Sequence, residues 1–125
     1  QSAEFLKLAG SFGEGVIGSS PGLPLEKMPG GMDFAKRFEE RFGNVQIYAP
    51  FAYDATKVLT GAMMKAGSSD PVKYLPVLAS YQMDGVIGPI AFDELGDLKD
   101  GPVTLYKVKD GRWEPVETVG GPPAS

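Results

Sequence analysis

The stretch from Tyr48 to Gly67 restricts the possible folds most, because its apolar residues recur at the spacing of one helix face. Pro50 near the start and Gly67 just past the end are residue types typical of helix boundaries. A helix of this kind cannot bury its apolar stripe alone, so a sheet or further helices must cover it. The residues of this stripe are Phe51, Ala55, Val58, Leu59, Ala62, Met63 and Ala66.

The residues ahead of this helix predict a strand end that leads into a helix start. Val45 to Tyr48 form a short extended run directly before the helix. In α/β proteins, ligands commonly bind where a strand end meets a helix N-terminus. We therefore expect a ligand site at this junction.

Composition excludes several classes of function. The 125 residues are 42% hydrophobic and 22% charged, which suits one modest core. The formal net charge of −4 argues against nucleic acid or an anionic membrane as the main partner, because no basic patch would release counterions. With no His and no Cys, this chain cannot assemble the usual zinc sites, Cys or His dyads, or Ser-His-Asp triads. No run reaches transmembrane length, and the chain does not open on a leader pattern, so we expect that export was unnecessary or a signal was removed.

The segments before the central helix alternate between helix and strand patterns. Residues 3–9 predict a short helix, and Glu14 to Gly18 predict a strand. A Pro- and Gly-rich connection from Ser19 to Gly31 has the length of a crossover rather than a tight turn. Met32 to Phe42 predict a second helix, because phenylalanines recur every four residues opposite a charged face.

The segments after the central helix end in a hairpin. Asp70 as N-cap and Pro71 at the first helical position predict a helix to about residue 80, kinked by Pro76. Gly85 to Phe92 predict an extended segment broken by a Gly-Pro pair, and residues 93–101 predict an acidic loop. Residues 103–109 and 112–119 alternate around an Asp-Gly pair, which predicts a β-hairpin. Residues 120–125 are expected to form a frayed or engineered tail.

This order of segments resembles the branched-chain amino-acid (Leu/Ile/Val) type of periplasmic solute-binding protein of ABC transporters. The most specific match is the run G-x-x-G-P-I-x-F-D-x-x-G-D-L from Gly85 to Leu98. The other matching pieces are EFLKLAG and GEGV near the start, the phenylalanine-striped helix ending in FG, YAPFAYDA, KAGSSDP and LYKVKDGRWEPV. The resemblance is collinear over nearly the whole chain.

The resemblance implies an α/β fold, the type I periplasmic-binding-protein fold with two doubly wound lobes. It implies that this chain is an incomplete C-terminal fragment that contributes to both lobes. Residues 1–20 would belong to the C-terminal lobe, 21–99 to the N-terminal lobe, 100–119 to a hairpin of the C-terminal lobe, and 120–125 to the tail. Most strands of each sheet would then be missing. We therefore expect the remaining N-terminal part as a second chain, a cleaved complex or a swapped oligomer.

The resemblance also implies a ligand wall, because the family holds a small amino acid or related carboxylate between its lobes. Most of the polar clamp would lie upstream of this chain. The residues left for the wall are Tyr48 first, as an amphipathic ring with a hydroxyl, then Gln46 and Phe51. The competing interpretation for Tyr48 and Phe51 is plain packing of a strand end against a helix start. For Gln46, the alternatives are a register error of one or two residues, or a different ligand.

Other candidate sites have simpler explanations. The acidic residues Asp93, Glu94, Asp97 and Asp100 lack the spacing of a calcium loop, and a solvated turn explains them better. Glu14 and Glu26 could form a carboxylate pair for acid–base work, but surface placement is the default. Trp113 is expected to cover the small C-terminal sheet, with a permease-facing surface as the alternative.

Three hypotheses for function follow, with no cofactor, no metal and no nucleic acid in any of them. The leading one is a periplasmic, exported, non-catalytic binding component that captures a small amino acid or carboxylate by lobe closure and delivers it to an ABC permease. The alternative is a ligand-sensing domain of a receptor with the same fold. An enzyme on an α/β scaffold is the third, disfavoured by the lack of His, Cys and a nucleophile motif.

Overall fold

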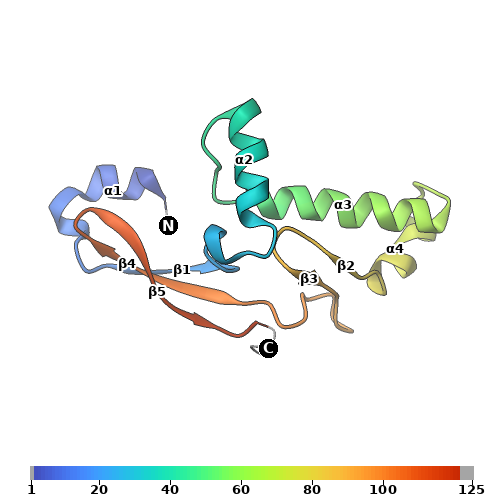
Figure 1. Ribbon diagram of the computed structural model, residues 1–125. Helices are drawn as coiled ribbons and strands as arrows, with labels where there is room; N and C mark the ends of the chain where they lie inside the picture. The colour runs from blue at the N-terminus through green and yellow to red at the C-terminus, as the bar shows by residue number, and fades with distance from the viewer. Residues whose placement is uncertain (1, 122–125) are drawn as a thin grey trace. The chain divides into compact units, whose positions relative to one another are not determined.

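The computed structural model describes residues 2–121, and its backbone contacts divide the chain into two compact units (Figure 1). Unit 1 comprises the residues up to Pro24 together with those from Asp100 onward. Unit 2 comprises Leu25–Lys99. The assignment of these units to two lobes stays a prediction, and the predicted tail lies outside the described residues from position 122.

Unit 1 is an antiparallel sheet of three strands in the order β1-β4-β5. Its strands are β1 (Ile17–Pro21), β4 (Val103–Lys109) and β5 (Arg112–Val119), preceded by helix α1 (Ala3–Ala9) and the 3-10 helix η1 (Gly10–Gly13). The β4–β5 hairpin is confirmed at its predicted bounds. Its turn residues Asp110 and Gly111 have φ angles of 50° and 70°, as a two-residue hairpin turn of type I′ requires.

The predicted strand from Glu14 to Gly18 was placed three residues too early, because β1 begins at Ile17. Gly15 has a positive φ of 79°, which interrupts the extended backbone there. Pairing with β4 nevertheless continues past the strand end. The N–H of Gly15 donates to the carbonyl of Val108 at 2.9 Å, and the N–H of Val108 donates to the carbonyl of Val16 at 2.8 Å.

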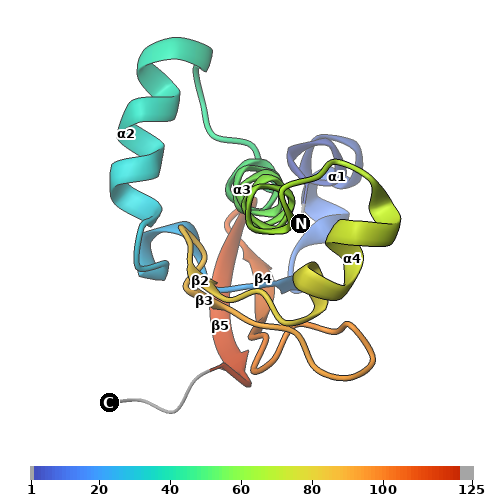
Figure 2. The ribbon, with the colours of Figure 1, turned by 90° about the vertical axis from the view of Figure 1, so that its right-hand side faces the viewer.

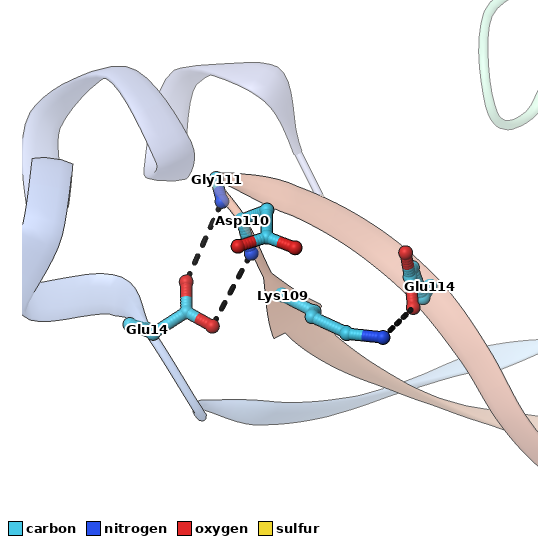
Figure 3. A network of polar contacts seen from close by, with 5 residues as sticks. All are labelled: Glu14, Lys109, Asp110, Gly111 and Glu114. Carbon is cyan, nitrogen blue, oxygen red and sulfur yellow. Dashed lines mark hydrogen bonds and ion pairs between the residues drawn. The ribbon is translucent and has the colours of Figure 1, made fainter.

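Glu14 closes the hairpin turn from outside the sheet (Figure 3). Its carboxylate oxygens accept hydrogen bonds from the N–H groups of Asp110 at 3.2 Å and Gly111 at 3.4 Å. Figure 3 also shows Lys109 facing Glu114 on the neighbouring strand, at 3.8 Å. Glu14 therefore serves the fold of unit 1, and nothing in its surroundings calls for acid–base chemistry.

The core of unit 1 lies on one face of β4, where alternate residues are buried. Thr104, Tyr106 and Val108 are exposed by 0%, 7% and 1%. Trp113 covers part of the sheet, as expected: its ring contacts Gly18 of β1 and lies 5.5 Å, centroid to centroid, from the ring of Phe5 on α1. A part-buried pair of hydroxyls joins Thr104 of β4 to Thr118 of β5, with 2.9 Å between their Oγ1 atoms.

Unit 2 is built on three helices and a short hairpin. The helices are α2 (Gly31–Phe42), α3 (Ala49–Ala66) and α4 (Pro71–Ala79), preceded by the 3-10 helix η2 (Leu25–Lys27). Strands β2 (Met83–Asp84) and β3 (Pro89–Ile90) pair antiparallel. Figure 2 looks nearly along α3 and shows α2 and α4 on different sides of it.

The three predicted helices of unit 2 are confirmed to within one or two residues, including their boundary residues. Asp70 accepts a hydrogen bond from the N–H of Val72 as the N-cap of α4, and Pro76 lies inside that helix as expected. Gly67 ends α3 in the left-handed conformation. These signals are local in sequence, so neighbouring residues alone determine them.

The predicted strand from Val45 to Tyr48 is wrong. Residues 45–46 have no regular structure and residues 47–48 form a turn, in which the N–H of Ala49 donates to the carbonyl of Gln46 at 3.0 Å. A strand needs a partner for its backbone groups, and none of the described residues pairs with this segment. The predicted extended segment from Gly85 to Phe92 is confirmed only in its second half: residues 85–88 form a tight turn, Pro89–Ile90 form β3, and Phe92 makes an isolated antiparallel bridge to Leu98.

Replacing Thr104 with Val tests the core of unit 1. The Oγ1 of Thr104 donates to the carbonyl of Gly22 at 2.7 Å, and valine keeps the shape without the hydroxyl. We expect a loss of about 1–3 kcal/mol in the free energy of unfolding, because buried acceptors lose their donor. Thr56→Val, on an exposed position of α3, is the control. Equal losses in denaturant unfolding at one protein concentration would contradict the account.

Candidate functional site

The predicted wall residues occupy the segment that leads into α3, which we call the entry segment (Gln46–Phe51). Tyr48 is the N-cap residue of α3 and its side chain is 67% exposed. Gln46 is exposed, and its side-chain amide donates to the carbonyl of Asn44 at 3.3 Å. Phe51 lies in the first turn of α3 and is half-buried. Tyr48 and Gln46 are therefore open to a ligand or partner, whereas Phe51 is partly covered.

The backbone of the entry segment is held by turn and helix hydrogen bonds. The carbonyl of Tyr48 accepts the N–H of Ala52 at 2.9 Å, which is the first bond of the α-helical pattern. Pro50, in the first turn, lacks an N–H and so leaves no unpaired donor at the helix start. The backbone of the segment is thus ordered, while the side chains of Gln46 and Tyr48 are exposed.

A row of aromatic rings connects α2 to α3 within unit 2. Successive ring centroids are 5.1 Å apart for Phe42 and Phe38, 5.5 Å for Phe38 and Phe34, and 5.4 Å for Phe34 and Tyr53. These separations suit tilted aromatic packing. The row lines a groove whose rim also includes Arg37, Glu40 and Arg41. Exposure rises along α2, from 5% at Phe34 to 72% at Phe42, so the apolar stripe continues beyond the part that unit 2 covers.

Sequence reasoning missed Asp54, the most informative buried polar residue of unit 2. Asp54 is 1% exposed and shares the buried row of α3 with Pro50, Val58 and Ala62. Its Oδ2 accepts a hydrogen bond from the N–H of Ile87 at 2.8 Å. The predicted stripe was therefore rotated: Ala55 and Leu59 of that stripe are exposed, and a carboxylate occupies the buried face instead.

In the acidic loop after β3, the carboxylate of Asp93 binds backbone N–H groups of the same loop. The Oδ1 of Asp93 accepts from the N–H groups of Leu95 and Asp97, both at 2.9 Å. Such a pattern is typical of a turn closed by its own side chain. Within residues 2–121, no group of three or more metal-ligating side chains is brought together, and no helix is long and apolar enough to cross a membrane.

Comparison with known proteins places this arrangement in a family. A family model described as periplasmic binding protein matches residues 2–112. The chain belongs to this family. Its mixed helix-and-sheet fold is that of the type I periplasmic binding proteins, as the sequence resemblance implied.

Two curated relatives show the sequence similarity of this periplasmic binding protein. A leucine-, isoleucine-, valine-, threonine-, and alanine-binding protein of Pseudomonas aeruginosa is 29% identical over 107 residues, which are 85% of this chain and 28% of that protein. A Leu/Ile/Val-binding protein homolog of Brucella abortus is 27% identical over 116 residues, which are 90% of this chain and 31% of that protein. The chain thus spans less than a third of the length of these relatives.

Two solved structures show the similarity of fold. A leucine binding protein of Thermotoga maritima superposes with a TM-score of 0.80 at 24% identity, over 94% of this chain and 34% of that one. An ABC transporter substrate-binding protein of Desulfitobacterium hafniense, in complex with Leu, superposes with a TM-score of 0.71 at 30% identity, over 90% of this chain and 39% of that one.

Truncating the aromatic row at its buried end and at its exposed end should change the free energy of unfolding by different amounts. We expect Phe34→Ala to cost about 3–5 kcal/mol in the free energy of unfolding, because it leaves a cavity between α2 and α3. Phe42→Ala, at the exposed end, should cost clearly less than Phe34→Ala, because Phe42 is 72% exposed and Phe34 only 5%. Denaturant unfolding of both variants measures the difference. An equal or larger cost at Phe42 would contradict this order of packing along α2.

Proposed function

We propose that this chain is part of the substrate-binding component of an ABC transporter, which captures a branched-chain amino acid or a related small carboxylate by lobe closure. The observation that carries the proposal is the match to relatives of this binding specificity along nearly the whole chain. Binding rather than catalysis fits the residues, because the chain has no His or Cys. We place the protein in the periplasm on the same grounds.

The entry segment is the proposed wall of the ligand site. Tyr48 offers an exposed aromatic face and a hydroxyl, which suit an apolar side chain and a nearby polar group. Gln46 offers an exposed amide, and Phe51 is half-buried in the first turn of α3. We propose that unit 2 belongs to the N-terminal lobe and unit 1 to the C-terminal lobe, so closure would bring a second wall against this one.

Exposed apolar residues in both units support a need for further polypeptide. In unit 1, Leu8, Phe12 and Ile17 are exposed by 79%, 95% and 65%. In unit 2, Phe42 and Met64 are exposed by 72% and 82%. Large apolar side chains left in water forgo the free energy that burial would provide. We propose that the remaining part of the binding protein covers them, as a second chain or in a swapped oligomer, and that the complete protein docks on an ABC permease.

Self-association of the chain on its own tests the proposed need for a partner. We expect the isolated 125-residue chain to elute in size-exclusion chromatography as an oligomer, because its apolar surfaces find cover only between copies. Replacing Leu8 and Phe12 with Ser should weaken this association. A monomer with one sharp unfolding transition, unchanged by the double substitution, would contradict the proposal.

Ligand-induced stabilisation tests the proposed binding function on the complete binding protein. We expect leucine, isoleucine or valine to raise the unfolding temperature, with a stabilisation of about 2.7 kcal/mol at a hundredfold excess over Kd. The control is a cationic amino acid such as lysine, whose charged side chain would meet an apolar wall. If no amino acid or small carboxylate shifts the transition, the proposed function is wrong.

Substitution of Tyr48 tests the proposed wall. We expect Tyr48→Ala to weaken binding of the stabilising ligand by about tenfold or more, or 1.4 kcal/mol and above, because an aromatic wall is lost. Tyr48→Phe separates the ring from the hydroxyl. Lys65→Ala, at an exposed position at the far end of α3, is the control. Equal affinities for Tyr48→Ala and Lys65→Ala, measured by calorimetry, would remove Tyr48 from the site.

A further inference from the structure

Asp54 is a carboxylate buried at a cost that the proposed function does not explain. Aspartate is almost never fully buried unless it is partnered. Here Oδ2 accepts the N–H of Ile87 at 2.8 Å, while Oδ1 is buried with no hydrogen-bond partner among the described residues. The other buried residues of its row on α3 are Pro50, Val58 and Ala62, so an apolar residue would suit this environment better. The carboxylate must therefore contribute something that apolar packing cannot.

The turn that receives this carboxylate is shaped around it. Residues 85–88 form a turn in which the N–H of Gly85 donates to the carbonyl of Gly88 at 2.8 Å. A Cβ added to Gly85 would lie 2.5 Å from Oδ2 of Asp54, closer than real Cβ contacts allow. The absence of a side chain at position 85 is thus what lets Asp54 reach the turn. Gly88 has a φ of 118°, a conformation that side-chain-bearing residues rarely adopt.

The same turn also holds the start of α2. The N–H of Gly30, the N-cap residue of α2, donates to the carbonyl of Val86 at 3.1 Å. A Cβ on Gly30 would lie 2.9 Å from the Cα of Val86, so this approach again depends on glycine. The starts of α2 and α3 are therefore both tied to one turn, the first by a backbone carbonyl and the second by a side-chain carboxylate.

Helix α3 connects this anchor to the entry segment. Asp54 lies six residues after Tyr48, and the carbonyl of Tyr48 already accepts the N–H of Ala52. A helix of 18 residues is stiff over this distance, so holding Asp54 on the turn also holds the first turn of the helix. Without the anchor, the start of α3 would be retained by packing contacts that allow rotation and sliding.

We infer that Asp54 is a positioning residue: by binding the turn of residues 85–88 it fixes the entry segment, which carries the proposed ligand wall. Asp54 is buried and acts through the helix, not by touching a ligand. The part that concerns ligand affinity rests on the proposed function, whereas the part that concerns the order of the entry segment does not.

The test compares Asp54→Ala with two matched variants in the complete binding protein. Asp54→Asn keeps an acceptor oxygen for Ile87, and Val58→Ala removes packing from the same buried row one helical turn later. Amide hydrogen exchange is measured for residues 46–53, 85–88 and 58–66, and leucine affinity is measured by calorimetry. Exchange reports local opening of each segment separately from global unfolding.

We expect Asp54→Ala to speed exchange in residues 46–53 and 85–88 by about tenfold or more and to raise the Kd for leucine by a similar factor. Asp54→Asn should keep both the exchange rates and the leucine affinity close to those of the unsubstituted protein. Val58→Ala should lower the unfolding temperature without either local effect. The inference is overturned if Val58→Ala changes exchange and affinity as Asp54→Ala does, or if residues 46–53 exchange at the unaltered rate in Asp54→Ala. If the unsubstituted protein binds no amino acid, the proposed function fails, and the exchange data alone decide the positioning role.

A double substitution checks the fit between Asp54 and the turn. Gly85→Ala should lower the unfolding temperature in the unsubstituted protein, because its Cβ collides with the carboxylate. In the Asp54→Ala background the same substitution should cost little, since the colliding atoms are gone. Additive effects of the two substitutions would show that the turn is not shaped around Asp54.

Discussion

The starts of α2 and α3 in unit 2 meet at one junction, where a buried carboxylate and a backbone N–H both bind the turn of residues 85–88. Asp54 of α3 and Gly30 at the start of α2 bind neighbouring residues of the same turn. Both approaches require glycine, at positions 85 and 30, because any side chain would collide. Backbone and carboxylate hydrogen bonds are directional, so they define the orientation of the two helices more sharply than apolar contact does.

The proposed binding site follows from this junction. Tyr48 is exposed at one end of α3, while Asp54 on the buried face of the same helix binds the turn of residues 85–88. A wall that must receive a ligand needs a fixed backbone behind an open side chain. Unit 2 supplies that combination, with an exposed Tyr48 on a helix that Asp54 holds to the turn.

Sequence alone predicted the parts of the fold that depend on neighbouring residues. The β4–β5 hairpin follows from one Asp-Gly pair, and the ends of α3 follow from Pro50 and Gly67. The strand predicted from Val45 to Tyr48 failed because extended structure needs a partner strand, which local sequence cannot reveal. Asp54 was missed for a related reason. Its hydrogen-bond partner Ile87 lies 33 residues later, so no local pattern of the sequence indicates the contact.

The glycines of the most specific motif gain a physical explanation from the structure. In sequence, the run from Gly85 to Leu98 indicated family membership through resemblance. In the structure, Gly85 makes room for Asp54 and Gly88 provides a backbone conformation that the turn needs. The motif therefore forms a junction inside one unit, and the proposed ligand wall lies elsewhere, in the entry segment.

The central claim is that the entry segment, held by this junction, forms a wall of an amino-acid site. A crystal structure of the complete binding protein with leucine tests it most directly. The account predicts the ring of Tyr48 within about 4–4.5 Å of the ligand side chain, the distance of apolar contact. A leucine bound away from Tyr48, Gln46 and Phe51, with the ring of Tyr48 packed against protein instead, would contradict it.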